Sequence, residues 1–261
     1  MPAMSTEVPP RAALSDEDLR KLLGLMKGSD SVELKLTVPE GDHRSAIAAL
    51  GLDPLDAQVR QVFFLDTPDL RASAAGVVVR ARRVQGKSGD SVVKLRPVEP
   101  ADLPEDLRRS PNFNVEVDAM PGGFVCSSSL KGVAENQRIK DAVEKRLPIR
   151  KLFSKEQRAF FEAYAPADLK LDELAVLGPI FVLRVKWAPG ASLRRMVAEM
   201  WLYPDGSRVM ELSTKCLPGE GFQVAAEARA FLAERGISLT GEQETKTRKA
   251  LEYFAGVLAG A

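Results

Sequence analysis

Polar and apolar residues alternate along much of this chain, and the alternation predicts a fold dominated by strands. A period of two is typical of a half-buried strand, because successive side chains point to opposite faces. Strands are predicted at 31–36, 62–65, 77–84, 91–96, 113–118, 180–187, 195–203 and 208–215. Asp205-Gly206, between the last two segments, is a strong hairpin signal, so these two strands are expected to pair.

Between the strands, the period changes to that of a helix. Ser15 precedes three acidic residues, and it predicts an N-capped helix that runs to about Lys27. Ser154 and Gln157 match a capping box at the start of a helix over 155–164. Further helices are predicted at 43–50, from Thr67-Pro68 onward, and at 129–146, 221–235 and 243–258.

No linker divides the chain, so the pattern predicts one folded domain. Residues 1–29 comprise a Pro-rich N-terminal tail and a short helix, and residues 30–258 form the domain. Strands joined by hairpins and helical excursions are typical of a mostly antiparallel sheet. The predicted fold class is α+β. No pattern in the sequence indicates an oligomeric state.

The polar faces of the predicted strands carry paired charges. Residues i and i+2 of a strand share a face. Basic pairs occur at Arg80/Arg82, Lys94/Arg96 and Arg184/Lys186, an acidic pair at Glu116/Asp118, and mixed faces at Glu33/Lys35 and Glu211/Ser213/Lys215. Solvated faces usually mix signs, because neighbouring like charges repel. The clustering of like charges therefore indicates a multiply charged ligand.

Two arrangements of these strands are compatible with the pattern. In the first, the apolar faces form a core and the charged faces meet solvent, as in many antiparallel sheets. In the second, the sheet closes into a barrel with the charges inside, and the helices cover the apolar outside. The like-charge pairs favour the second arrangement, and so do the several amphipathic helices, which need an apolar surface to cover.

Composition excludes several classes of protein. With 37 basic and 36 acidic residues among 261, the net charge is +1, which argues against a dominant nucleic-acid or membrane-surface role. Two cysteines and one histidine are too few for a structural zinc site or a disulfide framework. The first residues lack the apolar stretch of a signal peptide, and no segment reaches the length of a membrane span. A cytoplasmic location is therefore expected.

The charged faces suit a phosphate-rich ligand with a divalent cation. Arginine pairs with phosphate in a bidentate manner, and lysine supplies a movable point charge. Carboxylates at i and i+2 provide oxygen ligands for Mg²⁺ or Mn²⁺, which would also bind phosphate oxygens. The pattern thus predicts binding of a compound such as a triphosphate.

At these residues, the chain resembles the CYTH superfamily, the triphosphate tunnel metalloenzymes, over residues 30–258. The match begins with a Glu-x-Lys strand at Glu33 and Lys35, and it continues with an aromatic strand that runs into Asp66-Thr67-Pro68. The later matches are Arg80-x-Arg82, Lys94, Glu116-x-Asp118, Arg184-x-Lys186, Glu211, and Lys246 near the start of the last helix.

The resemblance implies an eight-stranded antiparallel barrel that forms a tunnel with a charged interior. It implies that phosphates are bound by Lys35, Arg80, Arg82, Lys94, Arg184, Lys186 and Lys246. It implies that Mg²⁺ or Mn²⁺ is bound by Glu33, Glu116, Asp118, Glu211 and Glu199, the last of which has the weakest strand alignment.

The chain departs from the family pattern at two positions that are usually acidic, Ser31 and Ser213. Neither hydroxyl supplies a negative charge, which weakens the metal site. The helix-rich stretch 127–175 is also longer than the family core requires, and it is interpreted as a lid or a partner surface. The predicted function is metal-dependent hydrolysis of inorganic triphosphate, a nucleoside triphosphate or thiamine triphosphate. The alternatives are a class IV adenylyl cyclase and a non-catalytic triphosphate- or polyphosphate-binding module.

Overall fold

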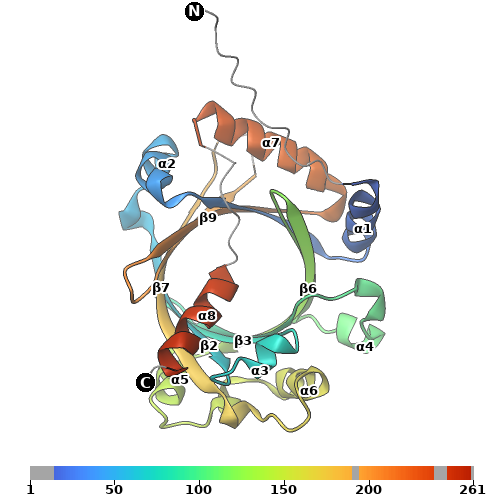
Figure 1. Ribbon diagram of the computed structural model, residues 1–261, viewed down its shortest axis with the longest axis vertical. Helices are drawn as coiled ribbons and strands as arrows, with labels where there is room; N and C mark the ends of the chain where they lie inside the picture. The colour runs from blue at the N-terminus through green and yellow to red at the C-terminus, as the bar shows by residue number, and fades with distance from the viewer. Residues whose placement is uncertain (1–14, 190–193, 238–245, 260–261) are drawn as a thin grey trace, which may run out of the picture.

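The structure, a computed structural model, describes residues 15–189, 194–237 and 246–259, and a closed β-barrel forms its centre (Figure 1). Around the barrel the strands follow the order β1-β5-β6-β4-β3-β2-β7-β8-β9, and β9 pairs again with β1. Their bounds are β1 Ser31–Val38, β2 Gln58–Asp66, β3 Val77–Val84, β4 Gly89–Leu95, β5 Phe113–Met120, β6 Gly123–Ala134, β7 Ala175–Trp187, β8 Met196–Leu202 and β9 Arg208–Cys216.

The barrel differs from the predicted eight-stranded antiparallel tunnel, which was wrong in two respects. Nine strands lie within the described residues, and β1 runs parallel to β5 while the other neighbours are antiparallel. The two differences have one cause. Directions cannot alternate around a closed ring with an odd number of strands, so at least one pair must be parallel.

The additional strand is β6, which the sequence did not reveal. Its centre is the run Ser127–Ser129, which lacks the alternation that marks a strand. Residues 129–146 were predicted to be helical, whereas β6 continues to Ala134 and the helix covers only Asn136–Val143. β6 pairs with β5 on one side and with β4 on the other, so tertiary pairing determines its conformation. The stretch 127–175 thus includes part of the barrel wall.

The helices confirm most of the predicted ends. They are α1 Asp16–Lys27, α2 His43–Ala49, α3 Arg71–Ala74, α4 Glu105–Arg108, α5 Asn136–Val143, α6 Lys155–Tyr164, α7 Gly221–Glu234 and α8 Lys246–Ala259. The predicted caps form, because Ser15 accepts a hydrogen bond from the Asp18 N–H, and the Ser154–Gln157 capping box is complete. Residues 243–245 of the predicted last helix lie outside the described residues.

The short helix expected from Thr67-Pro68 begins later than predicted, at Arg71. The Asp66 carboxylate accepts hydrogen bonds from the backbone N–H groups of Thr67, Ala72 and Ser73. Leu70, between these groups, has a φ of 58°. The buried Asp66 therefore organises a turn ahead of the helix, and Pro68 lies in that turn.

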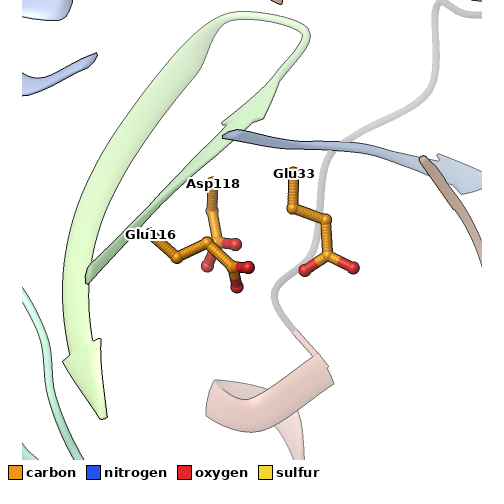
Figure 2. Close-up of side chains that lie close together, drawn as sticks. All are labelled: Glu33, Glu116 and Asp118. Atoms are coloured by element: carbon orange, nitrogen blue, oxygen red, sulfur yellow. The ribbon is translucent and has the colours of Figure 1, made fainter. Parts of the chain in front are cut away.

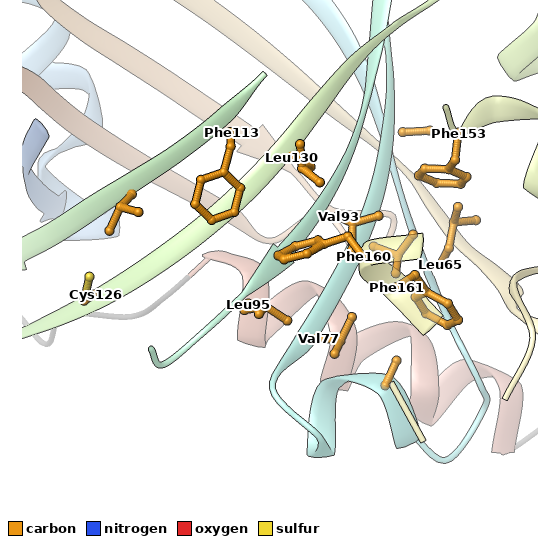
Figure 3. Close-up of a cluster of buried hydrophobic side chains, with 14 of the residues drawn as sticks. Leu65, Val77, Val93, Leu95, Phe113, Cys126, Leu130, Phe153, Phe160 and Phe161 are labelled. Atoms are coloured by element: carbon orange, nitrogen blue, oxygen red, sulfur yellow. The ribbon is translucent and has the colours of Figure 1, made fainter. Parts of the chain in front are cut away.

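The helices cover the outer surface of the barrel with apolar side chains. Phe160 and Phe161 of α6 lie in a buried cluster with Val93 of β4 and Leu130 of β6 (Figure 3). A second cluster joins residues of α2 and α7 to the outer faces of β1, β8 and β9. Because side chains alternate along a strand, the charged faces of these strands point into the barrel.

One end of the barrel interior is apolar, and α8 packs against it. Ala250, Leu251 and Phe254 of α8 cluster with side chains of β2 and β7, which include Phe64 and Ile180. Figure 1 shows α8 crossing part of the barrel opening. The barrel interior thus has an apolar cluster at the end where α8 packs, here called the apolar floor, and charged side chains in the remaining part. In the part of the chain that the structure describes, no helix is long and apolar enough to cross a lipid bilayer.

Candidate functional site

The barrel encloses a cavity of about 630 Å³ with a strong excess of positive charge. Thirteen basic side chains and three carboxylates line it. All seven predicted phosphate-binding residues belong to this lining: Lys35, Arg80, Arg82, Lys94, Arg184, Lys186 and Lys246. The structure therefore brings together side chains that are separated by up to about two hundred positions in the sequence.

The five predicted metal ligands fall into two groups. Glu33, Glu116 and Asp118 form the first group, here called the acidic cluster. One ligand oxygen of each lies within 4.8 Å of the others. Figure 2 shows the three side chains close together. β1 and β5 place them together, because Glu33 is the register partner of Asp118 in the parallel pair. Three carboxylates at this spacing fit a hard divalent cation.

Cations from the surrounding strands compensate the acidic cluster. Lys35 Nζ lies 2.7 Å from Asp118 Oδ1 and 3.1 Å from a Glu33 oxygen. Asp118 is completely buried, and Arg96 donates to it at 2.9 Å while Lys94 Nζ lies 3.7 Å away. Although burial opposes its charge, the carboxylates of Glu33 and Asp118 raise the pKa of Lys35. Two lysines and one arginine thus compensate the negative charge of the acidic cluster.

Lys94 is the weakest of these bases. Burial, together with the positive charges of Lys35 and Arg96, lowers its pKa to about 8, although Asp118 acts in the opposite direction. A group whose charged form is disfavoured in the free protein gains most from an incoming anion. The lowered pKa therefore indicates that this wall is arranged for negative charge from a ligand.

The second group, here called the Glu199–Glu211 pair, lies on β8 and β9. These residues are register partners, so their carboxylates lie side by side. Lys246 Nζ of α8 lies 2.5 Å from Glu199 Oε2 and 2.6 Å from Glu211 Oε1. Glu199 also accepts hydrogen bonds from Arg184 Nε at 3.1 Å and from Trp201 Nε1 at 3.2 Å.

The arginines of β3 complete the wall. Arg82 forms a bidentate pair with Asp90, whereas the buried Arg80 Nε has no hydrogen-bond partner among the residues that the structure describes. Burial and the neighbouring Arg82 lower the pKa of Arg80, which lies beside other cations. Because unpaired buried donors are costly, Arg80 is available to a phosphate oxygen in the cavity.

The cavity also contains basic residues that the sequence did not assign to it: Arg60, Arg96, Lys131, Arg194, Arg195 and Lys215. Three of them could have been found. Arg96 shares a strand face with Lys94, Lys215 shares one with Glu211, and Arg195 shares one with Glu199 in the predicted strand 195–203. Lys131 was missed since β6 was predicted as a helix. Arg60 was missed since β2 begins at Gln58, four residues before its predicted start.

The two serines at usually acidic positions contact the site without adding charge to it. Ser31 Oγ donates a 3.3 Å hydrogen bond to Glu116, its register partner on β5. Lys215 forms an ion pair with the same carboxylate. Ser213 lines the cavity two residues from Glu211. The acidic cluster therefore has three carboxylates.

Comparison with known proteins agrees with this architecture. No protein-family model and no curated protein sequence matches the chain. Among solved structures, a candidate adenylyl cyclase from Hippeastrum, described as having a dominant triphosphatase activity, is similar with a TM-score of 0.64 and 15% identity. The similarity covers 85% of this chain and 95% of that one. A candidate adenylate cyclase from Bacillus halodurans has a TM-score of 0.58 at 14% identity, over 84% and 97% of the two chains.

At such identities, the similarity concerns the fold. Both neighbours match over nearly their whole length, and the closed barrel with a charged interior is the architecture that the sequence resemblance implied. The sequence resemblance is thus confirmed at the level of the fold, which the chain shares with these two proteins.

Proposed function

We propose that this protein binds a triphosphate compound together with a divalent cation inside the barrel and hydrolyses it. One observation carries the proposal. Thirteen basic side chains line the cavity, and so do Glu33 and Glu116, whose carboxylates lie within 4.8 Å of each other and of the buried Asp118. A ligand that brings several negative charges and also binds a metal ion satisfies both features.

The basic residues bind and orient the phosphates. Arg80 and Arg82 on β3 supply planar donor groups, and Lys35 and Lys94 supply point charges on adjacent parts of the wall. Phosphate oxygens compete with Asp118 for Lys35, so ligand binding frees carboxylate oxygens of the acidic cluster. Positioning of this kind is the main contribution of the protein to phosphoryl transfer.

The acidic cluster fits Mg²⁺ or Mn²⁺ by its donor set. Glu33, Glu116 and Asp118 would hold the ion, which when bound neutralises charge on the phosphate oxygens. Ser31 keeps a hydrogen bond to Glu116 and thereby orients that carboxylate. The chain itself supplies the shape of the site, the phosphate donors and the exclusion of bulk water.

Adenylyl cyclase activity is the second candidate, because both similar structures are described as candidate adenylyl cyclases. The Hippeastrum protein is also described as having a dominant triphosphatase activity, which favours hydrolysis as the first candidate. Incubation with ATP and Mn²⁺ distinguishes them, since hydrolysis releases phosphate and cyclisation releases pyrophosphate and cyclic AMP.

The decisive experiment measures phosphate release from inorganic triphosphate, ATP and thiamine triphosphate with Mg²⁺ or Mn²⁺. The wild type is compared with Lys35→Ala and Glu116→Ala, and Lys27→Ala on the exposed face of α1 serves as the control. We expect turnover with at least one substrate, its loss in both cavity variants and on chelation, and no change in the control.

Absence of turnover with all three substrates would refute hydrolysis. Triphosphate that still raises the melting temperature of the wild type, but not that of Lys35→Ala, would then identify a non-catalytic binding module.

A further inference from the structure

The Glu199–Glu211 pair is an unusual arrangement for a barrel interior. The two carboxylates are direct register partners on antiparallel strands, and their side chains are 13% and 8% exposed. Directly opposed like charges destabilise a sheet, and burial increases the effect. A cation between them relieves this repulsion, and the residue that supplies it decides what else this part of the cavity can bind.

Lys246, the first residue of α8, supplies that cation. Its Nζ contacts Glu199 Oε2 at 2.5 Å and Glu211 Oε1 at 2.6 Å, so one ammonium group bridges both carboxylates. Bridging of two carboxylates on neighbouring strands is what a divalent cation would do here. An ammonium group has three N–H donors. Two contact the carboxylates, which leaves one for a phosphate oxygen in the cavity that Lys246 lines.

Lys246 is fixed in place by more than charge. Its Nζ lies 5.0 Å from the centre of the Trp201 ring, and its backbone oxygen accepts a hydrogen bond from the Tyr203 hydroxyl. The following turns of α8 pack Ala250 and Leu251 on the apolar floor of the barrel. The position of the ammonium group is thus set by the same packing that holds the helix.

Glu199 has further donors besides Lys246. Arg184 and the Trp201 indole donate to Glu199, and Arg60 lies 3.7 Å from it. Among the described residues, no third carboxylate joins this pair, and Ser213 stands two residues after Glu211 on the same strand face. By contrast, the acidic cluster groups three carboxylates, and it is the one such group among the described residues whose spacing could hold a metal ion.

From this difference, we propose that Lys246 occupies the place of a second divalent cation, so that the site takes one metal ion, at the acidic cluster. The inference deepens the proposed function. The metal ion at the acidic cluster and the shared triphosphate rest on that function, whereas the exclusion of a second ion by Lys246 does not. Glu199 and Glu211, predicted as metal ligands, are positioning residues for Lys246. One of the two positive charges that face the triphosphate is therefore the ammonium group of Lys246, which is part of the chain, and the other is a bound metal ion.

The test counts bound Mn²⁺ per chain by equilibrium dialysis, with and without non-hydrolysable imidotriphosphate. It compares the wild type with Lys246→Met, which keeps the apolar stem over Trp201 but removes the charge. We expect one ion in the wild type and two in Lys246→Met. The double variant Lys246→Met/Glu211→Gln should return to one, and Lys246→Arg should remain at one.

Two ions in the wild type, or no additional ion in folded Lys246→Met, would overturn the proposal. If Lys246→Met does not fold, the number of Mn²⁺ ions bound by the wild type decides the test: one ion supports the proposal and two overturn it. If the wild type binds no Mn²⁺ while Lys246→Met binds one, the acidic cluster is not a metal site and the proposed function fails. The assignment of Lys246 would still stand, so the two failures are distinguishable.

Discussion

The two acidic groups inside the barrel contain the same functional groups, yet their counter-ions differ in origin. The acidic cluster is compensated by side chains of the wall itself, among them Lys35 and Lys215, which reach it along flexible stems. The Glu199–Glu211 pair is compensated by Lys246, which a packed helix delivers. A metal ion and a phosphate can displace the first kind of counter-ion together, whereas displacement of the second requires movement of α8.

The largest effect, on the free energy of unfolding, is expected when the lysine that compensates the Glu199–Glu211 pair is removed, in comparison with a lysine of the acidic cluster. Lys246→Met leaves two buried carboxylates without their bridging cation, and the free energy of unfolding should fall by about 3–5 kcal/mol. Lys215→Met breaks the ion pair to Glu116, but the Lys215 side chain is 48% exposed, so its loss should cost about 0–1 kcal/mol. Urea unfolding of both variants in EDTA measures the difference. Equal losses would contradict the distinction between the two groups.

Lys35→Ala should have the next largest effect, on turnover. Lys35 contacts the acidic cluster and also lines the cavity, so its removal takes away a positive charge at the phosphate site. Loss of one preorganised electrostatic group typically costs about 10²- to 10³-fold in rate. Phosphate release under saturating Mn²⁺ measures it, with Lys27→Ala as the control. A loss below about tenfold would exclude Lys35 from the phosphate site.

Lys94 should produce a smaller effect that depends on pH. Its folded-state pKa of about 8 lies below the unfolded value of 10.5, so between these values the unfolded chain binds more protons and stability rises with pH. In EDTA, the wild type should therefore gain about 1–3 kcal/mol relative to Lys94→Met from pH 8 to 10.5. Affinity for imidotriphosphate should fall over the same range, as neutral Lys94 attracts no phosphate. Parallel pH profiles of the two proteins would refute the lowered pKa.

The smallest effect is expected from restoring an acid to the acidic cluster. Ser31→Glu places a fourth carboxylate beside Glu116, its register partner on β5. A further oxygen ligand should tighten Mn²⁺ binding by about tenfold, which corresponds to about 1.4 kcal/mol. Ser31→Gln, which adds a similar volume without charge, serves as the control in the same dialysis. Equal affinities of the two variants would mean that position 31 does not face the ion.

Much of the site was predictable because strand alternation is a local property. The pairs Arg80/Arg82 and Arg184/Lys186 were assigned to one face by their spacing, and the structure places all four in the cavity. The misses have equally local causes. Ser127–Ser129 concealed β6 and with it Lys131, and the early part of β2 concealed Arg60.

The amino-acid sequence alone determined most of the strands and their charged faces, through the alternation of charged and apolar residues. It also determined the N-terminal caps of α1 and α6 and the turn at Asp205-Gly206. These features depend on neighbours within a few positions. The tertiary structure alone decided the ninth strand, the parallel pairing of β1 with β5, and the assignment of Lys246 to Glu199 and Glu211. The parallel pairing joins residues 85 positions apart, and Lys246 lies 47 and 35 positions from its two carboxylates. β6 pairs on one side with β4, for example Gly89 with Ala134, and no local pattern encodes such contacts.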